Sequence, residues 1–343
     1  LKKNILNLTE DKRKSLISVY LKGNPKETVI LISNLLKNFP NDPLLFNLNG
    51  ACYKEMGLLD EAIKNFKNAL EVKPDDIEIY CNLGKTLKAN GQLNEAVTYY
   101  RKALEINPHY SDAHYNLGNA FLSLNKLNSA VKSYGRALDD KPNFADAHLS
   151  LGHVFRKLKQ RDKALFCFER AHAIKPSMNN IFGTLLNSKM HLCNWDDLSN
   201  QLQELRVRVN NNEKVIGPFS LMGLIDDPDL QKKASEIFVN HHCPKNHTLP
   251  KLTGYSKHLK IRIGYFSADF KTHPTAFLSA ELYELHDREQ FEVHAFSFGR
   301  NTNDEMNLRI KAGVDYFHAV YEMSHKEIVM LSRSLEIDIA VDL

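Results

Sequence analysis

The sequence predicts two folds in one chain, an all-α solenoid of antiparallel helix pairs followed by part of a doubly wound α/β sheet. Two observations lead to this prediction. Several columns of residues recur every 34 positions in the first half of the chain, and after residue 259 short strands alternate with helices. The apolar runs, such as 219–225, are far shorter than the roughly 18 to 20 residues needed to span a bilayer. We therefore expect no membrane-spanning segment.

The repeat is carried by proline, glycine, alanine and aromatic columns that stay in phase. Proline ends each period and cannot continue a helix, because it lacks an N–H group and clashes with the preceding turn. Glycine and alanine allow two helices to approach closely, and an aromatic residue is expected to fill the gap between successive pairs. The columns are Pro40, Pro74, Pro108, Pro142 and Pro176; Gly50, Gly84, Gly118 and Gly152; Ala62, Ala96, Ala130 and Ala164; and Phe66, Tyr100, Tyr134 and Phe168. The pattern resembles the tetratricopeptide-repeat (TPR) family, and we expect about five 34-residue repeats in residues 1–176.

Stacked helix pairs form a superhelix whose concave face is lined by the first helix of each pair, and such faces usually bind extended peptides. Asn82, Asn116 and Ser150 occupy one position of three successive repeats. An asparagine there can pair with the backbone of a bound peptide without reading its side chains. The alternative is that these are solvated polar positions, and the column is interrupted at Leu48.

After the repeats the sequence predicts a capping helix pair at 177–210 and a linker with a short helix at 211–258. His241, His242, Cys243 and His247 lie together in the linker, but no second cluster at zinc-site spacing follows them, so we expect no metal. The five cysteines form no CxxC pair, and their odd number argues against a disulfide framework: Cys52, Cys81, Cys167, Cys193 and Cys243. A reducing compartment, hence the cytoplasm, is the expected location.

The charge of the chain gives little information about partners. Lys and Arg number 45 against 41 Asp and Glu, so neither nucleic acid nor a membrane surface is indicated. The expected partners are proteins or peptides in the solenoid groove. Homo-oligomerisation is left open.

Residues 259–343 are predicted to begin a parallel sheet with right-handed crossovers. Four short runs rich in β-branched or aromatic residues are the expected strands, at 261–267, 291–298, 316–320 and 337–343. Three helical stretches lie between them, at 276–286, 303–312 and 324–335. Ligands of such sheets bind at the carboxyl ends of the strands.

A polar loop follows the first predicted strand and is the candidate site. It has neither the GxGxxG fingerprint of dinucleotide-binding folds nor a Walker lysine motif. Pro274 suits the first turn of the next helix, where free N–H groups could receive a phosphate, and Thr275 follows it. His273 is placed to move a proton nearby, although a histidine before a helix is more often only a cap. Asp269 either caps the loop or orients the site, and Lys271 is expected to be solvated.

Three segments resemble the SPINDLY-type protein O-linked N-acetylglucosamine transferase family, whose members carry N-terminal tetratricopeptide repeats. They are KIRIGYFSADFKTHPTAFL at 260–278, DREQFEVHAFSFG at 287–299 and EIDIAVDL at 336–343, and LCNWD at 192–196 resembles the segment that joins repeats to catalytic domain. The resemblance covers nearly all of the chain, and the order of the motifs is more specific than any one of them.

The resemblance implies a partial α/β Rossmann-like domain, the N-terminal lobe of a GT-B glycosyltransferase. The intact enzyme would transfer N-acetylglucosamine from its UDP carrier to Ser or Thr of proteins, with inversion and without a metal or other cofactor. His273 matches the active-site histidine of the family, with Asp269, Pro274 and Thr275 as substrate-binding candidates. Some members use fucose as the sugar.

Family members continue into a second lobe that carries most contacts to UDP. The chain starts with Leu1 and ends in a predicted strand, so the sequence suggests a protein truncated within its first catalytic lobe and inactive by itself. The alternative function is a non-catalytic TPR adaptor that binds peptides or proteins.

Overall fold

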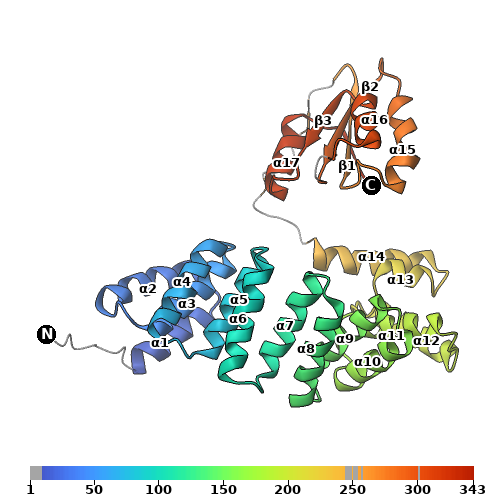
Figure 1. The fold of residues 1–343 in the computed structure, drawn as a ribbon. Helices are drawn as coiled ribbons and strands as arrows, with labels where there is room; N and C mark the ends of the chain where they lie inside the picture. The colour runs from blue at the N-terminus through green and yellow to red at the C-terminus, as the bar shows by residue number, and fades with distance from the viewer. Residues whose placement is uncertain (1–9, 244–248, 250–253, 256–257, 300–301) are drawn as a thin grey trace. The chain divides into compact units, whose positions relative to one another are not determined.

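The computed structural model describes residues 10–243, 249, 254–255, 258–299 and 302–343. The chain forms two compact units, Leu1–Pro244 and Lys245–Leu343. The predicted fold class is confirmed, because a helical solenoid is followed by a small parallel sheet (Figure 1).

Among the described residues ten helices form the repeat region, and each repeat contributes a first (A) helix and a second (B) helix. The A helices are α1 (Glu10–Leu21), α3 (Pro43–Glu55), α5 (Ile77–Ala89), α7 (Ser111–Ser123) and α9 (Ala145–Lys157). The B helices are α2 (Pro25–Asn38), α4 (Leu59–Val72), α6 (Leu93–Ile106), α8 (Leu127–Asp140) and α10 (Arg161–Ile174). The residues that join A to B have left-handed backbone conformation, with φ of 77° at Gly57 and Gly91, 56° at Asn125 and 60° at Lys159.

The glycine and aromatic columns pack on each other within one repeat. A Cβ atom built on Gly84 would lie 2.6 Å from the Tyr100 ring, and the same close approach joins Gly118 to Tyr134. These rings are fully buried. The aromatic residue therefore packs within its own helix pair, and Tyr134 also reaches Ser150 of the next pair, in line with the predicted filling of the gap between pairs.

The A helices line the inner face of the stack. Successive A helices, α3 with α5, α5 with α7 and α7 with α9, approach one another more closely than successive B helices do. Asn82 of α5 also donates a hydrogen bond to Asn47 of α3, at 3.3 Å. Because the A helices are nearer to one another, the stack curves with its A helices on the concave side.

Four more helices follow the repeats within the first unit: α11 (Ile181–His191), α12 (Leu198–Asn210), α13 (Pro218–Met222) and α14 (Pro228–His242). They share a hydrophobic core to which Phe182, Leu205, Leu221 and Leu230 contribute. The first part of the segment expected as a linker thus packs onto the predicted capping pair, because Leu221 and Leu230 are buried there.

The second unit contains a four-stranded parallel sheet in the order β3-β2-β1-β4. Its elements are β1 (Ile261–Ser267), α15 (Pro274–Glu284), β2 (Phe291–Ser297), α16 (Glu305–Gly313), β3 (Tyr316–Ala319), α17 (His325–Ser334) and β4 (Ile339–Asp342). Helices α15 and α16 share a core with one face of the sheet, and α17 packs on the other. The chain moves outward from β1 to β3 and then crosses back to place β4 on the other side of β1. The sheet therefore has a topological switch point beside β1.

Candidate functional site

The candidate site is the loop between β1 and α15, at the carboxyl end of the strand beside the switch point. Open α/β sheets bind their ligands in this location, because neighbouring loops diverge there and leave a crevice. The loop carries Asp269, Lys271 and His273, and their side chains are 33%, 39% and 40% exposed. The structure thus presents these three groups to solvent on one short segment.

His273 is the N-cap of α15. Its Nδ1 atom accepts a hydrogen bond from the backbone N–H of Thr275, at 3.3 Å, and Pro274 occupies the first helical position. A neutral ring with an accepting Nδ1 carries its proton on Nε2, so the ring offers a donor to the crevice. The helix offers fewer anion-binding groups than the sequence suggested, because Pro274 has no N–H and that of Thr275 is already bonded.

Asp269 lies near both Lys271 and His273 of the loop. Its carboxylate oxygens are 3.6 Å from His273 Nδ1 and 3.5 Å from Lys271 Nζ. Lys271, expected to be solvated, is partly exposed and also pairs with Asp269.

Three residues that the sequence reasoning missed hold the loop in place. The amide of Asn307 donates a hydrogen bond of 2.6 Å to the carbonyl oxygen of Phe270, and both residues are buried. Hydrogen bonds from Thr302, from the backbone N–H of Asn307 and from Thr272 hold the pKa of the Asp304 carboxyl well below its usual range.

Gly299 is the third of these residues. A Cβ atom there would lie 2.2 Å from the carbonyl oxygen of Ala268, so the close approach of the two segments requires glycine. Sequence alone gives one signal for this role, a glycine that directly follows the end of a strand.

The three groove candidates lie on the A helices α5, α7 and α9 but differ in their freedom to bind. Asn116 makes no side-chain hydrogen bond within the described residues, so its amide can pair with a peptide backbone. Asn82 donates to Asn47, as described above, and its oxygen remains an acceptor. Ser150 hydrogen-bonds the buried hydroxyl of Tyr134, which donates to Asn119 at 2.7 Å.

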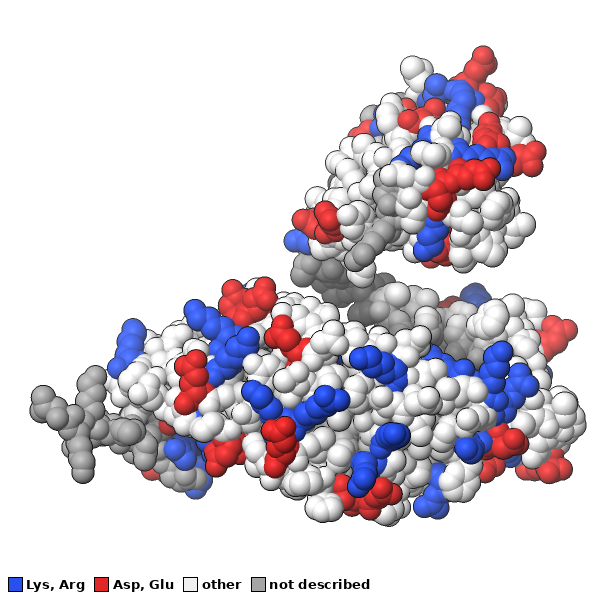
Figure 2. All heavy atoms as spheres, in the orientation of Figure 1, with Lys and Arg blue, Asp and Glu red and all other residues white. Residues whose placement is uncertain are grey.

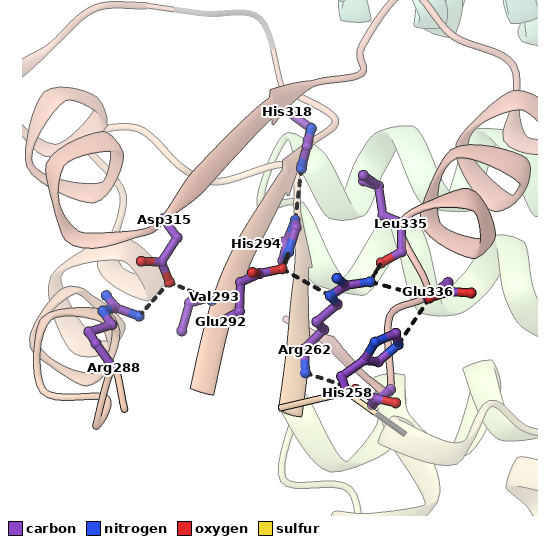
Figure 3. Close-up of polar contacts among 11 residues, drawn as sticks. His258, Arg262, Arg288, Glu292, Val293, His294, Asp315, His318, Leu335 and Glu336 are labelled. Carbon is purple, nitrogen blue, oxygen red and sulfur yellow. Dashed lines mark hydrogen bonds and ion pairs between the residues drawn. The ribbon is translucent and has the colours of Figure 1, made fainter. Parts of the chain in front are cut away.

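A polar network runs across the sheet, away from this loop (Figure 3). Arg262 Nε is 3.1 Å from Glu292, which is 2.9 Å from His294 Nε2. The Nδ1 atom of His294 is 3.1 Å from His318 Nε2, and burial together with His294 lowers the pKa of His318. These contacts tie β1, β2 and β3 together.

The charges and the remaining sequence predictions can be placed on the structure. Basic and acidic side chains are interspersed over the solenoid on the face drawn in Figure 2.

No helix in the described part of the chain is both long and apolar enough to cross a bilayer. Within the same residues no group of three or more potential ligands could hold a metal ion, and His247 lies outside them. All five cysteines are free.

The fold and site define a class of protein, a tetratricopeptide solenoid followed by a glycosyltransferase-like α/β segment. Family models agree with this class. Models described as TPR repeat match residues 50–91, 86–125 and 118–159, and one described as tetratricopeptide repeat matches 145–178. The model of glycosyl transferase family 41 matches residues 233–327, which include the β1–α15 loop.

Two curated relatives make the resemblance more specific. The chain is 30% identical over 176 residues to the protein named Probable UDP-N-acetylglucosamine-peptide N-acetylglucosaminyltransferase SEC of Arabidopsis thaliana, covering 46% of this chain and 18% of that protein. It is 42% identical over 52 residues to the UDP-N-acetylglucosamine-peptide N-acetylglucosaminyltransferase of Caenorhabditis elegans, covering 15% of this chain and 4% of that one. The predicted homology to protein O-linked N-acetylglucosamine transferases is thus confirmed.

Among solved structures, a mutant of the Thermobaculum terrenum O-GlcNAc transferase is similar with a TM-score of 0.44 and 20% identity, covering 78% of this chain and 45% of that one. MamA is similar with a TM-score of 0.44 and 24% identity, covering 50% of this chain and 97% of that one. Both likenesses are too weak to carry functional information.

Proposed function

We propose that this chain is part of a protein O-linked glycosyltransferase that transfers N-acetylglucosamine from UDP-N-acetylglucosamine to Ser or Thr hydroxyls. The observation that carries the proposal is the β1–α15 loop, which presents His273 at the switch point inside the segment that matches glycosyl transferase family 41. We place this function in the cytoplasm. The matched region spans 18% of the first relative, so the activity is assigned to the complete gene product.

His273 acts in this proposal at the reacting hydroxyl. Its Nε2–H can donate to an oxygen of donor or acceptor. Accepting a proton at Nε2 requires the ring proton to lie on Nδ1 instead, which gives up the hydrogen bond from the Thr275 N–H; the proton on Nδ1 would then face the Asp269 carboxylate, 3.6 Å away. Asp269 therefore positions the ring, and Pro274 and Thr275 fix the start of the helix that carries it. The transfer breaks the bond between the sugar C1 and the UDP oxygen and forms one to the acceptor oxygen, whose proton is released.

The relatives are named for UDP-N-acetylglucosamine, and no nucleotide contact is assigned to residues of this chain. We assign no metal or other cofactor to the reaction. The solenoid groove, with Asn116 at its centre and Asn82 and Ser150 beside it, holds the acceptor segment.

The test must separate capping from catalysis, because His273 also caps α15. His273→Ala removes both roles, whereas His273→Asn keeps a side-chain acceptor for the Thr275 N–H, since Asn is among the best N-cap residues. We expect both variants of the complete gene product to lose about 10²- to 10⁴-fold in transfer rate. The exposed Lys326→Ala on α17 is the matched control and should keep full activity. Full activity in His273→Asn would mean that His273 is only a cap.

A further inference from the structure

The inner face of the solenoid is electrically polarised. Between the repeat glycine and the end of each A helix, helices α3, α5, α7 and α9 carry five basic side chains and one acidic one, Glu55. The same helices carry three acidic side chains and no Lys or Arg before the glycine: Glu78, Asp112 and Asp146. We name the five basic residues the basic row: Lys54, Lys85, Lys88, Arg156 and Lys157.

The basic row follows the repeat. Lys54, Lys88 and Arg156 share one position, four residues after the glycine, and Lys85 directly follows Gly84. In α7 the position of Lys85 is taken by Asn119, whose oxygen accepts a hydrogen bond from Tyr134 and whose amide N–H groups remain as donors. The C-terminal side of the inner face thus offers cations or donors from α3 to α9.

The helix dipole does not explain this arrangement. Cations at a helix C-terminus are stabilising in any helix, so a dipole effect should also place them on the B helices. Yet α4, α6 and α8 have no basic residue in their last turns. Last-turn cations therefore occur on the groove-facing helices α3, α5 and α9 and not on α4, α6 and α8.

The basic row also lacks internal neutralisation. None of its five side chains forms an ion pair or hydrogen bond within the described residues. Lys54 is half-buried, and its burial, together with the neighbouring Lys85, lowers its pKa. The nearby carboxylate of Glu55 accepts a hydrogen bond from Tyr20 at 2.8 Å. The two cations are therefore held close together with the Glu55 carboxylate, itself bonded to Tyr20, as a nearby counter-charge, and a bound anion would offset the remaining repulsion.

We propose that the basic row is a recognition site for acidic side chains of an extended segment of a partner protein that lies along the inner face. This inference rests on the proposed groove function and adds a preference of the groove for segments with acidic side chains. Adjacent helices are about 10 Å apart and an extended chain rises about 3.3 Å per residue, so one repeat takes about three residues. The stretch from α3 to α9 then holds about nine residues. Acidic side chains on one edge of the segment meet the basic row, and the opposite edge faces Glu78, Asp112 and Asp146.

Fluorescence anisotropy with labelled peptides of about 12 residues tests the inference on this chain directly. One peptide carries Glu at every third position in a Ser/Ala/Thr background, and two matched peptides carry Gln or Lys in place of Glu. We expect the Glu peptide to bind on the order of 10-fold more tightly than the Gln peptide, with the difference shrinking at high salt. The double variant Lys85→Gln/Lys88→Gln should remove the difference. The control Lys64→Gln/Lys132→Gln, exposed on the B helices α4 and α8, should keep it.

The outcomes separate this inference from the function on which it rests. Equal binding of the Glu and Gln peptides would refute the recognition of acidic side chains by the basic row but would leave the peptide groove intact. An equal effect of the Lys85/Lys88 and Lys64/Lys132 double variants would mean the same. Binding of none of the three peptides would overturn the groove and the basic row together, and neither result depends on catalysis.

Discussion

The packing of the repeats predicts opposite effects on stability when two glycines, Gly84 and Gly135, are replaced by alanine. Gly84→Ala places a Cβ atom 2.6, 2.8 and 2.9 Å from three atoms of the Tyr100 ring, which is fully buried and cannot swing away. Overpacking of this kind costs up to about 3 kcal/mol, and the better helix propensity of alanine returns about 1 kcal/mol. We expect a net loss of about 2 kcal/mol. Gly135→Ala in α8 meets no atom within 4 Å, so we expect a gain of about 0.5 to 1 kcal/mol.

Urea denaturation followed by far-UV circular dichroism measures both variants, because the helical unit dominates the signal. For a unit of this size the loss in Gly84→Ala corresponds to a Tm lower by about 4 to 8 °C. Replacing the Tyr100 ring by a smaller side chain, in the double variant Gly84→Ala/Tyr100→Leu, should recover part of the lost stability. The recovered part would appear as a coupling free energy of about 1 kcal/mol or more between the two positions. If Gly84→Ala is as stable as the unmodified chain while Gly135→Ala gains stability, the assignment of the glycine column to helix contact is wrong.

Three further predictions concern other parts of the chain. Asn307→Ala should destabilise the C-terminal unit by about 1 to 3 kcal/mol, because it leaves the buried Phe270 carbonyl without its donor; an unchanged hydrogen-exchange rate in the β1–α15 loop would contradict this. Tyr100→Phe should change stability by less than about 0.5 kcal/mol, since the buried Tyr100 hydroxyl has no hydrogen-bond partner among the residues that the structure describes, and a larger loss in urea denaturation would contradict this. Burial, with Arg156 and Lys157, lowers the pKa of His153 from 6.5 to about 4, so the unfolded chain takes up a proton before the folded one. Stability should then be full above pH 6.5 and fall towards pH 4, by at most about 1.4 kcal/mol per pH unit, and His153→Gln should flatten this slope in pH-dependent melts.

The repeats could be predicted because the same local structural requirements select the same residue types at the same positions of every repeat. Proline ends a helix wherever it occurs, and glycine marks the contact with an aromatic ring sixteen residues later, as from Gly84 to Tyr100. Strand positions in the second unit were also predictable, since alternation of strand and helix is a local pattern. The contact of each ring with the glycine of its own helix pair was not predicted, because the spacing alone does not say which neighbouring helices a ring meets.

The bracing of the candidate loop could not be predicted in the same way. The hydrogen bond from Asn307 to Phe270 joins residues 37 positions apart, and its existence depends on the packing of α16 against the end of β1. Of the two roles of His273, the N-cap of α15 could be predicted from the sequence and the proximity to Asp269 could not. A histidine before a helix suggests a cap, but the distance to Asp269 that makes the ring a candidate acid or base is a property of the folded loop.

The central claim is that the β1–α15 loop belongs to a sugar-transfer site, and one measurement tests it most directly. The complete gene product is incubated with UDP-N-acetylglucosamine and a protein extract, and Ser or Thr residues that carry N-acetylglucosamine are identified by mass spectrometry. We predict modification by the unmodified protein and by Lys326→Ala, and none above background by His273→Ala or His273→Asn. Absence of modification by the unmodified protein, or equal modification by the His273 variants, would contradict the account.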